Sequence, residues 1–401
     1  MANKKEEAPQ IQNEQLQKML EEKSTALELM QREAAIEAAL EKVRARTMAM
    51  QRSGELSETA SEMFKQIQTL GMHPWACGFN IFDKDEKAVT QWMSKADGGI
   101  SPPFRTPLIE DPLFISIYEA RQRRDELLVM ESSGEELAET YRYMFGLPGS
   151  KEIFGDLENS GFEMPKFQIT HCAYFSQGYL VFITYEQVAE SWDIFKRFAK
   201  VFEQTYTRFL DLQKAEAQAR ESQIQLAMER VRARTMAMQK SDELAEAASL
   251  LFKQIEDLGT TAWSSGFDIW LANEASATAW MTNPDGSIGM PFVVPYTEDP
   301  FFKQIYAARE SGTDFFVMES SGKELEETYE YLFNLPDAKK HFDGVKSLGF
   351  QMPAFQITHC AFFSQGFLMF ITYEPVPEMW DIFKRFAKVF EQTYTRFLDL
   401  Q

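Results

Sequence analysis

The longest uninterrupted helical pattern of apolar and polar positions spans Ala189 to Gln239. This stretch contains no Pro or Gly and is rich in Ala, Glu, Gln, Arg, Leu and Met, which all favour the α-helix. We therefore predict one helix of about 50 residues, roughly 75 Å long. A helix of this length is typical of a coiled coil or a rigid connector.

Apolar residues in this helix recur in alternating steps of three and four, which is heptad spacing. A first series lies at Trp192, Phe195, Ala199, Phe202, Tyr206 and Phe209, and a second at Ile224, Met228, Val231, Thr235 and Met238. Residues 209 and 224 are not separated by a multiple of seven, so a continuous seam needs a stutter between them. The first series packs either on its own domain or on a second helix. For the second series we predict the seam of a signalling helix in a parallel homodimer.

The sequence repeats itself at a constant offset of 188 residues. The motif THCA at 170–173 recurs at 358–361, and VRARTMAMQ at 43–51 recurs at 231–239. The segment Trp192–Gln213 reappears unchanged as Trp380–Gln401. A period this long indicates a duplicated whole domain and not a solenoid.

Within one unit, apolar periodicity and turn residues predict a mixture of helices and strands. The expected order is a helix from Ser53 to Gly71, strands 76–82 and 87–93, a helix opened by Asp111-Pro112, a strand 126–130, a helix capped at Ser133, a hairpin of 167–175 and 179–185, and the long helix. This order predicts an α+β domain in which an antiparallel sheet is flanked by helices.

Domain boundaries follow from the repeat. We predict a flexible tail over 1–23, a connecting coiled-coil helix over 24–52, domain 1 over 53–211 and domain 2 over 241–401, with a linker helix over 189–240 that overlaps the end of domain 1. The sequence stops at Gln401, the equivalent of Gln213, where the first copy continues into the linker. We therefore expect the natural protein to continue into an output domain.

Composition narrows the partners and the compartment. The formal net charge of −20 argues against nucleic acid and anionic membranes as partners, because both require clustered Lys and Arg. No apolar run is long enough to span a bilayer within this segment. Three cysteines, at positions 77, 172 and 360, form no disulfide framework, which predicts a cytoplasmic protein.

The connectors LEKVRARTMAMQRS and MERVRARTMAMQKS, with the element order above, resemble those that precede GAF-like domains in bacterial sensor histidine kinases and related two-component regulators. The resemblance implies a sheet with one face on the terminal helices and the other forming a small-molecule pocket under loops. It also implies parallel homodimers through the helices. Bilin-binding members of the family carry Cys followed by His, whereas this chain has the reverse order, so the cofactor is left unknown.

Candidate ligand contacts are residues duplicated on the predicted strands. In strand 167–175, His171 shares a face with Ile169, while Cys172 shares the opposite face with Gln168 and Thr170. The candidates are His171, Cys172, Trp75, Phe79 and Trp92 in domain 1, and His359, Cys360, Trp263, Phe267 and Trp280 in domain 2. The alternative, which we favour for the histidines, is burial with a hydrogen bond to a neighbour; the aromatic residues then fill the core.

No nucleophile with a general base and no cluster of metal ligands stands out, so no catalytic residue and no metal ligand is assigned. We expect a sensory or regulatory module, not an enzyme. It would bind a small molecule or a partner and transmit the change through dimeric helices to an output domain absent from this sequence. One alternative is a ligand-free dimerisation and spacer scaffold. Another is an enzyme that uses Cys172 and Cys360, or His171 and His359.

Overall fold

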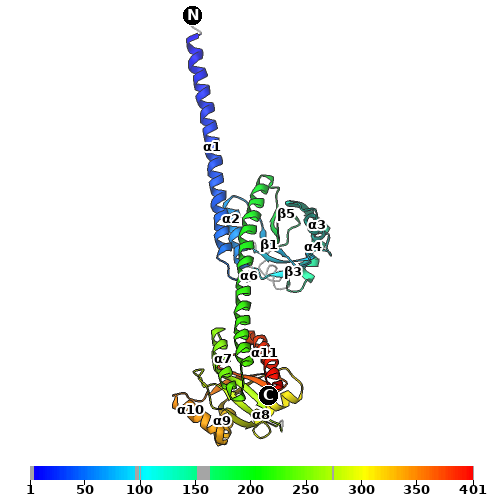
Figure 1. Ribbon diagram of the computed structural model, residues 1–401. Coiled ribbons are helices and arrows are strands. Elements are labelled where there is room, and N and C mark those ends of the chain that lie inside the picture. Colours follow the sequence, from blue (N-terminus) through cyan, green and yellow to red (C-terminus); the bar gives the residue numbers. More distant parts are fainter. Residues whose placement is uncertain (1–3, 95–98, 100, 151–162, 273–274, 401) are drawn as a thin grey trace. The chain divides into compact units, whose positions relative to one another are not determined.

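The computed structural model describes residues 4–94, 99, 101–150, 163–272 and 275–400. The chain divides into two compact units, residues 1–215 and 216–401, and each is described by itself (Figure 1). The boundary falls within one long helix, which contributes to both units.

Domain 1 begins with the long helix α1 and ends with the first half of α6. Its elements are α1 (Lys4–Met48), η1 (Ser53–Glu55), α2 (Leu56–Thr69), β1 (Ala76–Phe82), β2 (Ala88–Met93), β3 (Phe104–Pro107), α3 (Pro112–Arg123), β4 (Leu127–Ser133), α4 (Gly134–Gly146), β5 (Phe167–Phe175), β6 (Gly178–Thr184), η2 (Ala189–Ser191) and α6 (Trp192–Met236).

Domain 2 repeats this plan after the second half of α6. Its elements are η3 (Ser241–Glu243), α7 (Leu244–Asp257), β7 (Ala262–Trp270), β8 (Ser276–Met281), β9 (Phe292–Pro295), α8 (Pro300–Glu310), β10 (Phe315–Ser321), α9 (Gly322–Asn334), α10 (Pro336–Ser347), β11 (Phe355–Phe363), β12 (Gly366–Thr372), η4 (Pro377–Met379) and α11 (Trp380–Asp399).

Each domain is built on a six-stranded antiparallel sheet. The strand order is β3-β2-β1-β6-β5-β4 in domain 1, and the equivalent strands follow the same order in domain 2. The predicted α+β class, with an antiparallel sheet flanked by helices in each of two domains joined by a long helix, is confirmed. The short strands β3 and β9 were not predicted, because they lie in a loop rich in Gly and Pro where four residues give no readable alternation.

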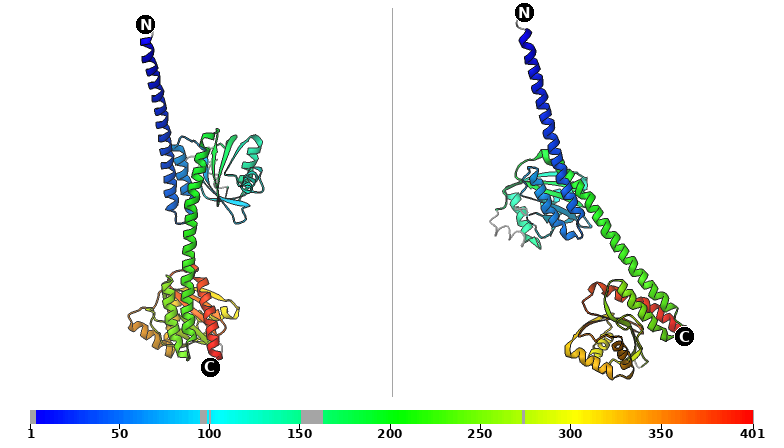
Figure 2. Two further views of the ribbon diagram at one scale, coloured as in Figure 1. Left: turned by 45° about the horizontal axis from the view of Figure 1, so that its top comes forward. Right: turned by 90° about the vertical axis from the view of Figure 1, so that its left-hand side faces the viewer.

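Helices cover the two faces of each sheet unequally. In domain 1, α1, α2 and α6 cover one face, and α3 and α4 lie against the other (Figures 1 and 2). The first face is filled by stacked rings, with Phe79 on Phe202 at 4.0 Å and Phe182 on Phe195 at 4.1 Å. Domain 2 repeats both stacks. All four domain 1 rings are fully buried, so this face is packed as a core.

The heptad series towards the end of α6, which the sequence predicts to form a dimer seam, is instead packed inside the core of domain 2. Four of the residues pack with α7 and α11, and the fifth, Thr235, is also buried and donates its hydroxyl to the backbone of Val231; the series is Ile224, Met228, Val231, Thr235 and Met238. The equivalent series in α1 is buried in the same way; it is Ile36, Leu40, Val43, Thr47 and Met50. Heptad spacing describes any helix packed lengthwise on neighbouring helices, so it does not tell an internal partner from a second chain. The first series in α6 likewise packs on its own domain.

The predicted flexible tail also differs from the structure. The helix α1 already begins at Lys4, well inside the stretch 1–23. The physical reason is composition, because residues 10–23 are almost entirely Gln, Glu, Lys, Leu and Met, which have high helix propensity.

The predicted hairpin between β5 and β6 is present, with Ser176 and Gln177 in its turn. Gly178 does not take a left-handed backbone conformation. Glycine is required there for a different reason: a Cβ on Gly178 would lie 1.9 Å from the backbone oxygen of Asn80 on β1. Gly366 repeats this close approach, with a Cβ placed 1.9 Å from the oxygen of Asp268.

We predict that Gly178→Ala destabilises domain 1 by about 3 kcal/mol, because the clash is with backbone that must move. Hydrogen exchange across a urea series measures this, since it reports each domain separately. Gly54→Ala is the control: no atom lies within 4 Å of a Cβ there, so the change should stay within about 0.5 kcal/mol. Equal stability of the two variants would contradict the close approach of β1 and β6.

Candidate functional site

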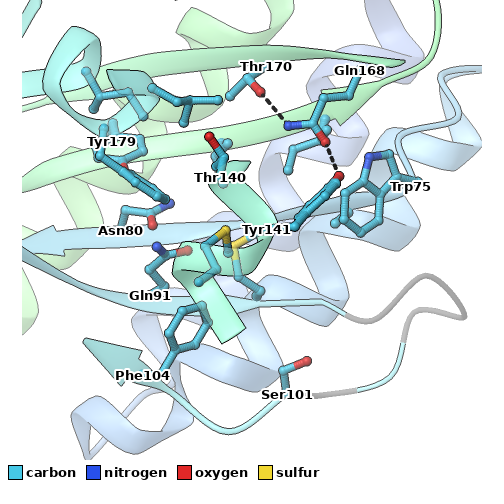
Figure 3. A pocket seen from close by; sticks show the side chains of 18 of the residues that line it. Trp75, Asn80, Gln91, Ser101, Phe104, Thr140, Tyr141, Gln168, Thr170 and Tyr179 are labelled. Carbon is cyan, nitrogen blue, oxygen red and sulfur yellow. Dashed lines mark hydrogen bonds between the residues drawn. The ribbon is translucent and has the colours of Figure 1, made fainter. Parts of the chain in front are cut away.

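Domain 1 contains a cavity of about 90 Å³ between its sheet and the helices α3 and α4 (Figure 3). It lies on the sheet face opposite the stacked phenylalanine rings. Its walls are largely apolar, with polar side chains at a few positions. The lining residues labelled in Figure 3 are Trp75, Asn80, Gln91, Ser101, Phe104, Thr140, Tyr141, Gln168, Thr170 and Tyr179. Apolar walls with a few convergent polar groups are typical of small-molecule sites.

One wall carries a chain of hydrogen bonds. The hydroxyl of Tyr141 donates to Gln168 Oε1 at 2.6 Å, and Gln168 Nε2 donates to Thr170 Oγ1 at 3.2 Å. Gln168 and Thr170 share one face of β5, so strand alternation directs both into the cavity. Nearby, Thr140 donates to the carboxylate of Asp111, which caps α3. These hydrogen bonds hold the polar side chains of this wall in place without a ligand.

The amide of Asn80 is different. Its side chain is 1% exposed and lines the cavity from the middle of β1, yet neither its nitrogen nor its oxygen has a hydrogen-bond partner among the residues that the structure describes (Figure 3). Burying a polar group without partners costs on the order of 1–3 kcal/mol. A bound molecule that offers one donor and one acceptor would satisfy this amide.

Domain 2 has a smaller cavity of about 50 Å³ at the equivalent place. Asp268 replaces Asn80, and Tyr296 replaces Leu108 and lines part of the space. The Tyr296 hydroxyl donates to Asp268 Oδ1 at 2.9 Å, while Asp268 Oδ2 has no hydrogen-bond partner in the described part of the chain. Burial raises the pKa of Asp268 to about 7, although the hydrogen bond from Tyr296 acts in the opposite direction.

The duplicated histidines lie on the other face of each sheet, against the terminal helix. His171 is fully buried, with its Nε2 3.0 Å from Thr184 Oγ1 and its ring beside Phe195. Burial lowers the pKa of His171 to about 4. His359 has the equivalent hydrogen bond, to Thr372. Both histidines are therefore buried with a hydrogen bond to a neighbouring side chain, which is the interpretation that we favour from the sequence.

Of the ten candidate contacts, Trp75 and Trp263 line the cavities. The other eight do not line a cavity. Six of them pack on the helix-covered face of the sheet, namely Phe79, Trp92, His171, Phe267, Trp280 and His359. Cys172 and Cys360 lie in the cores on the cavity side but do not line the cavities. We selected these residues because both copies of the domain carry them. Residues of the core are also shared by the two copies, so this criterion does not separate them from ligand contacts.

Sequence reasoning missed the residues that do line the domain 1 cavity, above all Asn80, Tyr141 and Gln168. A usable signal existed in β5, because alternation had placed Gln168 and Thr170 together on one face. For Asn80 the signal was weaker: an amide in the middle of a strand of mainly apolar residues.

Comparison with known proteins adds little to this geometry. No family model matches the chain, and no curated protein matches it. Among solved structures, the bacteriophytochrome RpBphP3 from the photosynthetic bacterium R. palustris is similar over 84% of this chain, with a TM-score of 0.32 and 10% sequence identity. The chain spans 63% of the length of that protein. A likeness this weak shows neither a family nor a function.

Two further observations concern the part of the chain that the structure describes. No helix there is long and apolar enough to cross a membrane. Within the same residues, no three His, Cys, Asp or Glu side chains come close enough to hold a metal ion.

The raised pKa of Asp268 predicts a pH-dependent stability of domain 2. A carboxyl whose pKa rises on folding contributes stability that is present below about pH 4 and lost as the pH rises through about 7. We therefore expect Asp268→Asn to gain about 2–3 kcal/mol over the unsubstituted protein between pH 5 and pH 8, in urea unfolding followed by hydrogen exchange.

Comparing the Asp268→Asn variant with the unsubstituted protein isolates the contribution of Asp268 to stability, because both proteins carry the neighbouring Tyr296, Cys360 and His341. Tyr296→Phe serves as the control variant: it removes the hydrogen bond that lowers the pKa of Asp268, so the loss of stability should extend to higher pH. A pH-independent difference between Asp268→Asn and the unsubstituted protein would mean that Asp268 is not titrating in this range.

Proposed function

We propose that this chain is a sensory module in which domain 1 binds an uncharged small molecule. The observation that carries the proposal is the buried, unpartnered amide of Asn80 in the wall of the cavity. None of the residues described in that wall carries a charge, which favours a neutral ligand. The donor and acceptor of one carboxamide match a planar ligand amide or a similar heterocyclic group.

A route from the cavity to α6 is built into β1 and β6. In the sheet, Asn80 pairs with Tyr179 and the next residue pairs with Gly178, at the hairpin. The hairpin is bonded to α6: Glu203 accepts the backbone N–H of Ser176 at 2.8 Å, and Gln177 donates to Thr207 at 2.9 Å. A ligand that favours one position of β1 over another would therefore bias the packing of α6.

The dimer element that we propose is α1 and no longer the end of α6. Every side chain from residue 15 to residue 35 is exposed, and the N-terminal part of α1 extends away from the sheet of its domain (Figure 2). Six large apolar side chains in this part are more than half exposed; they are Leu16, Met19, Leu20, Leu27, Leu29 and Met30. A single helix with so many exposed apolar residues is marginal in water, and a second α1 would cover them.

We also propose that the cysteines do no chemistry. Cys172 and Cys360 are fully buried, and burial raises the pKa of both thiols above their ordinary value. A buried neutral thiol is neither accessible nor nucleophilic. This is the basis for proposing a binding module instead of an enzyme.

We predict opposite effects of Asn80→Leu on stability and on binding. Without ligand, Leu removes an unsatisfied buried amide at similar volume, so domain 1 should gain about 1 kcal/mol. The cyclic amide 2-pyrrolidone, used as a probe, should raise the thermal stability of domain 1 in the unsubstituted protein and not in this variant. Gln177→Leu, at the hairpin and outside the cavity, is the control that should keep the response.

If Asn80→Leu destabilises domain 1, or if native mass spectrometry and a screen of neutral amides find nothing that binds, the amide is a structural feature. The ligand-free scaffold would then be the better account of domain 1.

We predict that Leu20→Asp with Leu27→Asp converts a dimer into a monomer of 46.3 kDa in light scattering after size exclusion, because two charges enter the seam. Val231→Ala, in the series first assigned to a seam, should destabilise domain 2 by about 2 kcal/mol and leave the mass unchanged. A mass change in Val231→Ala alone would restore the earlier assignment.

A further inference from the structure

The domain 2 cavity holds a carboxyl group with an unused oxygen. Asp268 is 1% exposed, and its Oδ1 accepts the Tyr296 hydroxyl while Oδ2 has no partner among the described residues. No Lys or Arg is found among the described residues that line this cavity. A carboxylate that ionises here has no cation beside it in the cavity wall, and such a group is costly to bury unless a cation joins it.

A second acceptor lines the same cavity. His341 on α10 is 3% exposed, and its ring hydrogen-bonds the backbone of Met290. Its Nδ1 has no hydrogen-bond partner among the described residues, so it can accept a hydrogen bond when the ring proton is on Nε2. Two buried acceptors without partners among the described residues suit a ligand that carries several N–H groups.

Aromatic rings make up much of the remaining wall. They come from β7, β9, α8, α9 and α10; among them are Trp263, Phe292, Phe301, Phe302, Tyr329 and Phe342. Aromatic faces attract cations, and the attraction is strongest where water is excluded. The walls and the acceptors therefore favour the same kind of ligand.

We propose that the cavity of domain 2 binds a small primary ammonium cation, whose N–H groups donate to Asp268 Oδ2 and His341 Nδ1 and whose charge is surrounded by aromatic rings. The cavity volume of about 50 Å³ limits the cation to a few heavy atoms. This site is separate from the one proposed in domain 1, and neither proposal depends on the other.

The duplication explains why the two cavities would select different ligands. At one register position domain 1 has the neutral amide of Asn80 and domain 2 has Asp268. Domain 1 has Leu108 where Tyr296 holds the carboxyl in domain 2. The exchange of an amide for an acid therefore changes the charge of the preferred ligand while the surrounding sheet stays the same.

The test uses ethylammonium chloride as the probe, ethanol as its neutral counterpart of equal size, and the full chain in isothermal titration calorimetry at pH 7.5. A ligand of three heavy atoms reaches a Kd of about 1 mM at best. We expect ethylammonium to bind in this range, ethanol to bind at least tenfold more weakly, and Asp268→Asn to weaken ethylammonium at least tenfold. Asn80→Leu should leave ethylammonium binding unchanged.

Asp268→Asn is expected to fold, because Asn80 occupies the same position in domain 1. A measurement on the unsubstituted protein tests the site independently of any variant. Because burial raises the pKa of Asp268 to about 7, binding of the cation at pH 6.5 should release more than half a proton per site, measured by titration in buffers of different ionisation enthalpy.

Three results would overturn the proposal. They are the absence of any ethylammonium binding at 50 mM probe, equal affinity for ethanol, and binding that Asp268→Asn leaves unchanged. The last result would assign the cation to acidic groups on the surface, which carry most of the chain's charge of −20.

Discussion

Both domains depend on the ring stacks between the sheet and its terminal helix. Phe79 and Phe182 of the sheet each lie on a phenylalanine of α6, and domain 2 repeats this with Phe267 and Phe370 on α11. Because these rings and the helices beyond them fill one face completely, any cavity must form on the other face. The stacks also attach the central strands of the domain 1 sheet to α6.

The helices around each core are further tied by charge. Arg197 on α6 forms ion pairs with Glu33 and Glu37 on α1, and Arg385 on α11 pairs with Glu221 in α6, which is the equivalent of Glu33. The entering helix and the closing helix of each domain are thus held together in the same register. These pairs are partly exposed, so each contributes little alone. The pairs made by Arg197 lie where α1 leaves its domain, next to the stretch of α1 whose apolar side chains are exposed.

The sequence predicted the fold class, the duplication and the β5–β6 hairpin, since these follow from local periodicity and from self-similarity. It did not predict that Val231 packs inside domain 2, because heptad spacing is the same whether the partner is internal or external. Eight of its ten candidate contacts also do not line a cavity. His171 and Trp92 stood out because they are rare, large and duplicated, whereas Asn80 and Gln168 line the domain 1 cavity from the opposite face of the sheet. That face becomes identifiable once the strand order is known.

Duplicated domains offer an internal comparison that a single domain lacks. Where the copies agree, as at Gly178 and Gly366, the shared residue answers a backbone constraint, here a Cβ that would lie 1.9 Å from a carbonyl oxygen. Where they differ inside the same frame, as at Asn80 and Asp268, folding does not dictate the side chain, because both side chains are accommodated by the same strand pairing. Each of these two residues leaves buried polar atoms unpartnered, and folding alone gives no reason to keep such a cost twice. The binding that we propose gives one, and it accounts for the change from an amide to an acid between the two cavities by assigning them different ligands.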